Sequence, residues 1–95
     1  MQDDDFEWND AKAARNWELH GISFEMARDV FRDVFAIEWI DREHGDNEER
    51  FIILGVVEGH VLFVSYTMRD GRIRIISARL AEPLERRRYH NENKA

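Results

Sequence analysis

The side chains best suited to chemistry on an anion are seven arginines within residues 60–90. Only Asp70, Glu82 and Glu85 oppose them there, so this segment carries a net charge of +4. Residues 1–59 hold six Lys or Arg against sixteen Asp or Glu, and the whole chain has a net charge of −6. Because the overall charge repels anions, the basic segment indicates that an anionic ligand is held at one place.

Arg72 and Arg74 alternate with isoleucines, which places both side chains on one face of a strand. Arginine is permanently charged and can hold a phosphate with two parallel hydrogen bonds, so these residues could bind a phosphate group and stabilise negative charge that develops on it. Arg79 has the opposite parity in an ideal strand. It reaches the same face only if the strand ends or bulges at Ser77-Ala78. The alternative is that these arginines only solvate or protect a strand edge.

Chemistry on a phosphate ester also needs groups that accept and donate protons. Tyr89 follows Glu85 by four residues and Arg86 by three, so all three can share one helical face, where guanidinium groups could favour the phenolate. His20 is a second candidate, because imidazole changes charge near neutrality. Each has a structural alternative: Tyr89 could anchor a C-terminal helix, and His20 could bind the last carbonyls of its own helix.

Other basic and aromatic side chains are weaker candidates. Four basic residues could contact phosphate or simply solvate their elements: Lys12, Arg69, Arg86 and Arg87. His44 lies in an acidic loop and His60 beside a predicted turn. No His pair has metal-ligand spacing and the chain has no cysteine, so we expect neither a metal site nor a cofactor. Three tryptophans could stack on bases, although core or interface roles are commoner: Trp8, Trp17 and Trp39.

Length and composition predict one domain over residues 1–95. A chain of this size can bury about 65% of its unfolded surface, and its apolar content suffices for a core. No apolar run has membrane-spanning length, and the N-terminus does not resemble a secretion signal. We therefore expect a soluble, cytoplasmic protein.

The first half of the chain predicts a short strand, two helices and a second strand. Residues 6–8 alternate as in a strand. Asn9 or Asp10 can cap a helix that ends at Leu19 or His20 before Gly21. One face of that helix is lined by Ala11, Ala14 and Trp17. Ser23 caps a second helix with core spacing at Phe24, Ala27, Val30 and Phe31. Residues 36–40 read as a strand, and residues 41–50 as a polar loop with turns at Gly45 and Asn47.

The second half predicts an antiparallel meander of residues 51–57, 61–67 and 72–78, joined at Glu58-Gly59 and Asp70-Gly71. A tight second turn pairs Arg69 with Arg72, Thr67 with Arg74, and Ser65 with Ile76. Both sheet faces are apolar away from the hairpin tip, so helices should cover much of the sheet. Pro83 suits the first turn of a closing helix through about Asn91. The predicted fold class is α+β.

The ordered set of short motifs resembles the BrnT family of ribonuclease toxins, over about residues 6 to 90. The N-terminal motifs are Phe6-Glu7-Trp8-Asn9, Lys12, Asn16 and His20-Gly21-Ile22-Ser23-Phe24-Glu25. The C-terminal motifs are Arg50, Gly55, Tyr66-Thr67, the run from Arg72 to Arg79, Ala81, Glu85-Arg86-Arg87 and Tyr89. Leu19 and His90 depart from a basic and an acidic residue that the family usually has at these positions.

The resemblance implies a RelE-like fold and metal-independent endoribonuclease activity that inhibits translation. It favours a functional role for Arg72, Arg74 and Arg79. It also implies neutralisation by a cognate antitoxin of ribbon-helix-helix type (BrnA-like), in a hetero-oligomer that touches DNA only through the antitoxin. A non-catalytic module that binds RNA or an acidic protein is the alternative, and the joint presence of the three arginines and Tyr89 favours the enzyme.

Overall fold

The computed structural model describes residues 1–44 and 47–93, which form three α-helices and one five-stranded sheet. The strands are β1 (Phe6–Glu7), β2 (Ile37–Asp41), β3 (Arg50–Val57), β4 (His60–Arg69) and β5 (Arg72–Leu80). The helices are α1 (Asp10–His20), α2 (Phe24–Asp29) and α3 (Pro83–Glu92), with a 3-10 turn over Val30–Arg32. The predicted α+β class is confirmed. Gly45, expected as a turn residue, lies outside the described residues.

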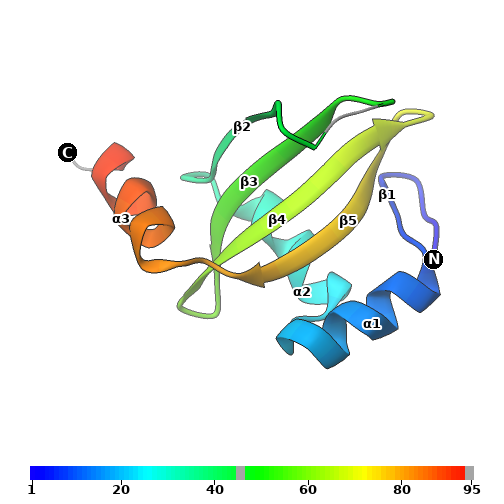
Figure 1. Cartoon of the computed structure of the whole chain (residues 1–95), viewed down its shortest axis with the longest axis horizontal. Helices are drawn as coiled ribbons and strands as arrows, with labels where there is room; N and C mark the ends of the chain where they lie inside the picture. The colour runs from blue at the N-terminus through cyan, green and yellow to red at the C-terminus, as the bar shows by residue number, and fades with distance from the viewer. Residues whose placement is uncertain (45–46, 94–95) are drawn as a thin grey trace.

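The sheet has the order β1-β5-β4-β3-β2, and β2 to β5 form an antiparallel meander (Figure 1). Both predicted turns are tight. Glu58 and Gly59 have φ of 51° and 82°, and Asp70 and Gly71 have φ of 52° and 76°. Two successive residues with positive φ match the right-handed twist of the flanking strands. At the other edge, β1 pairs in parallel with residues 73–74 of β5.

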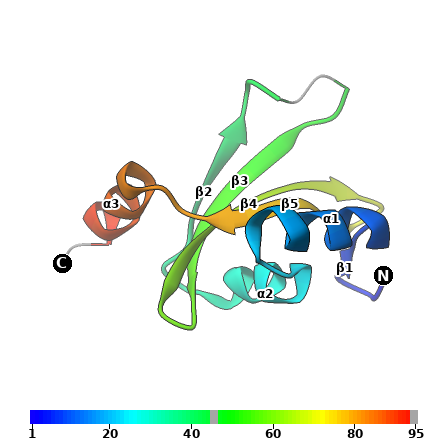
Figure 2. The same ribbon diagram turned by 60° about the horizontal axis from the view of Figure 1, so that its bottom comes forward.

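One face of the sheet, called here the covered face, packs against α1, α2 and the 3-10 turn (Figure 2). Phe24, Ala27 and Val30 are at most 1% exposed, and they belong to one apolar cluster with Val64 of β4 and Ile75 of β5. The side-chain oxygen of Ser23 accepts a hydrogen bond from the amide of Met26 and caps α2 as predicted. The predicted core spacing of α2 is confirmed.

The inward face of α1 differs from the predicted one. Ala11, Ala14 and Trp17 are exposed, whereas Asn16 is 5% exposed. The Asn16 amide donates to the carbonyls of Ile22 and Ala78 and accepts from the Ala78 amide, at 2.8–3.1 Å. This part of β5 lies beyond its short pairing with β1, so its backbone needs a partner. The buried side chain of Asn16 supplies this partner. Hydrophobic periodicity alone predicted that an apolar face of α1 would pack here.

The register of the β4–β5 hairpin follows the prediction at Arg69–Arg72 and Thr67–Arg74 and then shifts. Ser65 pairs with Ser77, not with Ile76 as expected, because β5 contains one extra residue between Ile75 and Ser77. Such a bulge reverses the side-chain parity of everything that follows it. Arg79 consequently pairs with Phe63 and lies on the same face as Arg74.

The second face of the sheet, called here the open face, is covered by a helix only at one end. There Tyr89 of α3 packs with Leu54, Val61 and Ala81 in a small apolar cluster. Figure 2 shows α3 apart from α1 and α2, beyond the end of the sheet. The expectation that helices cover much of the sheet is therefore right for the covered face and wrong for most of the open face.

Candidate active site

The open face carries a row of arginines along β5. Arg74 forms an ion pair with Glu7 of β1 at 3.2 Å, and both side chains are mostly buried. Arg72 lies at the hairpin tip, where its Nε donates to the carbonyl of Asp3 at 2.7 Å. Arg69, opposite Arg72 on β4, lies 3.7 Å from Glu48. The fold brings together the arginines that the sequence singled out on this strand.

Arg79 is the most rigidly held member of the row. Its two terminal nitrogens donate to the two carboxylate oxygens of Glu85 at 2.8 and 3.0 Å. Its guanidinium lies 3.9 Å from the centroid of the Phe63 ring. The hydrogen bonds that Arg79 donates to Glu85 raise the pKa of Arg79. Burial would raise the pKa of Glu85, but the bonds from Arg79 and from the Glu82 amide outweigh it and lower that pKa.

The arginine row is therefore partly neutralised in the isolated chain. A phosphate that binds there has to share or displace the carboxylates of Glu7 and Glu85. Arginine has five donors in a planar fork, so a guanidinium held by one carboxylate can still donate to a second anion. The carboxylates fix the orientation of the cations before the ligand arrives.

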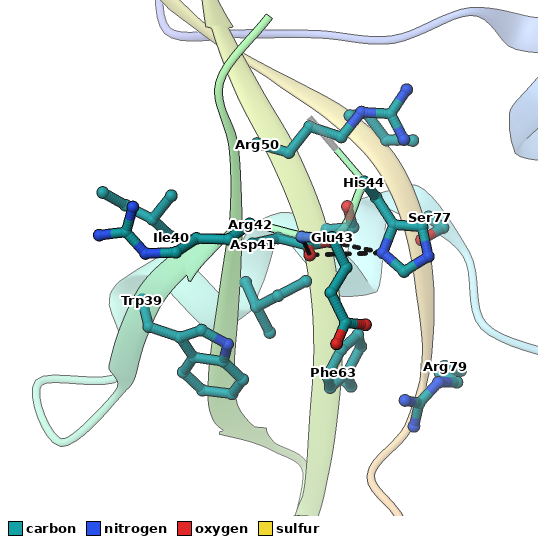
Figure 3. A pocket seen from close by; sticks show the side chains of 13 residues that line it. Trp39, Ile40, Asp41, Arg42, Glu43, His44, Arg50, Phe63, Ser77 and Arg79 are labelled. Carbon is teal, nitrogen blue, oxygen red and sulfur yellow. Dashed lines mark hydrogen bonds and ion pairs between the residues drawn. The ribbon is translucent and has the colours of Figure 1, made fainter. Parts of the chain in front are cut away.

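A hollow of about 640 Å³ lies beside this row on the open face (Figure 3). Trp39, Ile52 and Phe63 supply apolar lining from β2, β3 and β4. The polar and charged lining comes from β2, β3, β4, β5 and the loop after β2, and includes Asp41, His44, Arg50, Ser77 and Arg79. The His44 Nδ1 lies 3.1 Å from an Asp41 oxygen, as the dashed lines in Figure 3 show. The fold thus combines the imidazole of His44 with three arginines, Arg42, Arg50 and Arg79.

Sequence reasoning gave His44 little weight and did not select Arg50 or Asp41 as site residues. The pairing of β2 with β3 places Asp41 opposite Arg50 and Trp39 opposite Ile52. Residues 39–41 and 50–52 each show alternation with a charged residue at the loop end. Treating these two runs as one hairpin would have put the two charged residues on the same face.

Tyr89 occupies a different environment from the predicted one. Its hydroxyl donates to Asp33 at 2.5 Å, and burial together with this carboxylate raises the pKa of Tyr89 to about 12. The expectation that guanidinium groups favour its phenolate is therefore wrong. Asp33 also accepts from the amides of Phe35 and Val56, so it ties α3 to β3. This geometry favours the anchoring role.

The remaining predicted residues lie around rather than within the hollow. Lys12 and His20 are exposed on α1, which packs on the covered face, so the fold does not group them with the arginine row. Arg86 and Arg87 are exposed on α3, and Arg86 donates to the carbonyl of Ala81 at 2.9 Å.

Within residues 1–44 and 47–93, no group of three or more His, Asp or Glu could hold a metal ion. None of the helices in this part of the chain is long and apolar enough to cross a membrane.

Three helices on a mostly antiparallel five-stranded sheet, with arginines on its open face, fit the small RelE-like toxins. Residues 8–85 match the family described as "Ribonuclease toxin, BrnT, of type II toxin-antitoxin system". The chain belongs to this family, and it is a ribonuclease toxin with an RNA substrate and a cognate antitoxin. The match ends at Glu85, so it includes all β5 arginines but not Arg86, Arg87 or Tyr89. No curated protein matches the sequence.

Proposed function

We propose that this toxin cleaves RNA internally and without a metal ion on the open face of the sheet, and thereby inhibits translation. Residues 1–95 act as one toxin domain in this proposal. The observation that carries it is the bulge in β5, because it places Arg79, which lines the hollow, on the same face as Arg74. A row of fixed guanidinium groups on one face can bind the scissile phosphate, its developing negative charge and the neighbouring RNA backbone.

The β5 arginines have different roles in this proposal. Arg79, which lines the hollow, holds the scissile phosphate and stabilises the phosphorane, and Arg74 binds the next phosphate along the strand. Glu85 and Glu7 set the orientations of these two arginines. Arg72 binds the adjoining RNA backbone at the hairpin tip. Removing one such preorganised donor typically lowers the rate about 10²–10³-fold.

The other predicted residues are assigned by their distance from this row. Arg69 and the exposed Arg86 and Arg87 extend the RNA contact at the tip and along α3. The roles of Lys12 and His20 stay predictions from the sequence alone. Both residues lie on α1, so in this proposal they contact at most a part of the RNA that is far from the cleaved bond. We assign Tyr89 to anchoring α3.

Expression without antitoxin tests the assignment. The chain should arrest bacterial growth and fragment cellular RNA, whereas Arg72→Ala, Arg74→Ala and Arg79→Ala should each relieve the arrest while staying folded. Arg32→Ala is the matched control, since Arg32 is an exposed arginine beside the covered face. Full toxicity of all three variants would exclude the arginine row. An intact RNA pool with the unmodified chain would favour the non-catalytic alternative.

Chelation tests the metal-free mechanism separately. Purified toxin should cleave RNA at the same rate with and without excess EDTA. Loss of cleavage with EDTA and rescue by a divalent ion would overturn this part of the proposal and leave the ribonuclease assignment intact.

We propose that the antitoxin is of ribbon-helix-helix type (BrnA-like) and covers the open face in a cytoplasmic hetero-oligomer, with DNA contacted only by the antitoxin. The supporting observation is that Arg74 and Arg79 of β5 already form ion pairs with carboxylates, so acidic side chains of a partner can take the same positions. Association should be faster at low salt, because about 0.15 M salt limits the field to roughly 8 Å. A rate indifferent to salt, with unchanged binding of an Arg72→Ala/Arg74→Ala variant, would place the antitoxin elsewhere.

A further inference from the structure

We infer that Asp41 and His44 form the proton-transfer pair of this ribonuclease, with His44 as the general base that activates the 2′-hydroxyl of the RNA. The inference rests on the proposed site on the open face and adds a reacting group to it. The arginines alone cannot take a proton, because a guanidinium stays charged in proteins. Among the described residues that line the hollow, His44 supplies the one imidazole, the side-chain type best suited to general base catalysis.

The contact between the two residues defines what each can do. The Nδ1 of His44 lies 3.1 and 3.3 Å from the two Asp41 oxygens, so a protonated Nδ1 donates to the carboxylate. This arrangement leaves Nε2 as the basic nitrogen, as in other imidazole bases oriented by a carboxylate. The His44 side chain is 67% exposed and can therefore reach a substrate in the hollow.

Asp41 is held in place by the sheet and by the loop. Its side chain is only 13% exposed, and its carboxylate also accepts from the amide of Glu43 at 3.1 Å. As the last residue of β2, it pairs with Arg50 of β3. A positioned carboxylate selects the tautomer of the imidazole and stabilises the imidazolium that forms during the reaction.

Cations on two walls of the same hollow would hold the phosphate beside His44. Arg79 comes from β5 and Arg50 from β3 (Figure 3). The Arg50 Nε is buried without a hydrogen-bond partner among the described residues, whereas Arg79 is fixed by Glu85. Cavities of about 300–1,000 Å³ accommodate small ligands, so the volume of this hollow suits a nucleotide unit of RNA.

The loop after β2 adds two further charged residues to the lining of the hollow. Arg42 and Glu43 line the hollow, in addition to Asp41, Arg50 and Arg79. Glu43 is the competing base, since an exposed carboxylate beside the hollow could also accept a proton. The experiment therefore includes Glu43.

The reaction is balanced without a metal or a cofactor. His44 Nε2 takes the proton of the 2′-hydroxyl, the 2′-oxygen forms a bond to phosphorus, and the bond from phosphorus to the 5′-oxygen breaks. The leaving 5′-oxygen takes a proton from water, and the imidazolium returns its proton to solvent. The products are a 2′,3′-cyclic phosphate and a 5′-hydroxyl end.

Cleavage of a model RNA by purified variants tests the inference. His44→Ala and His44→Gln should lower kcat about 10²–10⁴-fold and change KM little, because general bases contribute about that factor. His60→Ala is the matched control, since His60 is exposed at the β3–β4 turn. The acid limb of the wild-type profile of kcat/KM against pH should be absent from the His44 variants.

Asp41 is a positioning residue and needs a readout that a purely structural role would not change. Asp41→Asn should lower kcat less than His44→Ala. The ¹⁵N shifts of the His44 ring should change from a single Nδ1–H tautomer toward a mixture. Binding of a 2′-O-methyl RNA, which cannot react, should shift the His44 and Arg50 resonances of the wild-type protein.

The outcomes separate this inference from the proposed function. If Arg74→Ala and Arg79→Ala abolish cleavage while the His44 and Asp41 variants keep the wild-type rate and pH profile, the inference is overturned and the site on the open face stands. Loss of activity in Glu43→Gln with full activity in His44→Gln would also overturn it. Failure of wild-type toxin to cleave RNA would overturn both.

Discussion

The two faces of the sheet are made by the same strands and differ in what they hold. On the covered face, Val64 and Ala78 are fully buried among the apolar residues of α1 and α2. On the open face of the same two strands, Ser65 and Arg79 line a hollow, and the cations are held by carboxylates. Neighbouring residues of one strand therefore lie on opposite faces, one in the apolar core and the next in the candidate active site.

The comparison suggests that stability and activity can be changed separately in this toxin. Apolar burial on the covered face supplies most of the free energy of folding. Partly exposed ion pairs on the open face contribute little to stability, typically about 0–1 kcal/mol each. Mutations on the two faces should consequently give different phenotypes.

The largest stability effect is expected from Phe24→Ala on the covered side. Phe24 is 1% exposed and contacts Trp8 edge to face. Its truncation should lower the free energy of unfolding by about 3–5 kcal/mol, measured by chemical denaturation. Phe35→Ala is the control, because Phe35 is 61% exposed. Its truncation should lower the free energy of unfolding by less than about 1 kcal/mol. Equal losses in the two variants would contradict the division between the faces.

Asn16→Ala should have the next largest effect. The variant leaves the amide and carbonyl of Ala78 without their side-chain partner in a buried position. An unsatisfied buried group costs about 1–3 kcal/mol, which denaturation would measure. Hydrogen exchange at the Ala78 amide should also accelerate. Unchanged exchange would mean that another group protects this edge of β5.

Tyr89→Phe tests whether α3 is anchored or catalytic. Loss of the hydrogen bond to Asp33 should cost about 1–2 kcal/mol, while cleavage of RNA stays near the wild-type rate. A large loss of kcat with unchanged stability would restore the catalytic role predicted for Tyr89.

The same variant should alter the dependence of stability on pH. Burial would raise the pKa of Asp33, but hydrogen bonds from Tyr89, Val56 and Phe35 outweigh it and lower that pKa in the folded chain. The stability from Asp33 is therefore present above its ordinary pKa near 3.8 and is lost as pH falls through the lowered value. Tyr89→Phe should make this acid loss smaller, and an unchanged pH profile would contradict the assignment.

Glu85→Gln should have the smallest effect on stability, below about 1 kcal/mol, because its pair with Arg79 is partly exposed. The substitution removes a competing negative charge from the open face. Binding of a 2′-O-methyl RNA at low salt should therefore become a few-fold tighter, measured by fluorescence anisotropy. Weaker binding would show that orientation of Arg79 by Glu85 outweighs the gain in charge.

Local patterns in the sequence predicted most of the elements correctly. Asn9, Ser23 and Gly21 marked helix ends because capping depends on a few neighbouring backbone groups. Asp70-Gly71 predicted the hairpin because both residues must adopt positive φ. The packed face of α1 was predicted wrongly, because the requirement for Asn16 arises from Ala78, 62 residues away.

The candidate site shows the same division between local and long-range information. The sequence alone determined that arginines at positions 72 and 74 share a strand face, since parity depends only on spacing. Arg79 lies on the same face only because β5 contains one extra residue, and the position of that residue cannot be deduced from the alternation of side chains. The grouping of Asp41, His44 and Arg50 with Arg79 depended on the packing order of four strands. Tertiary structure decided these contacts because they join residues that are distant in the chain, where local periodicity carries no information.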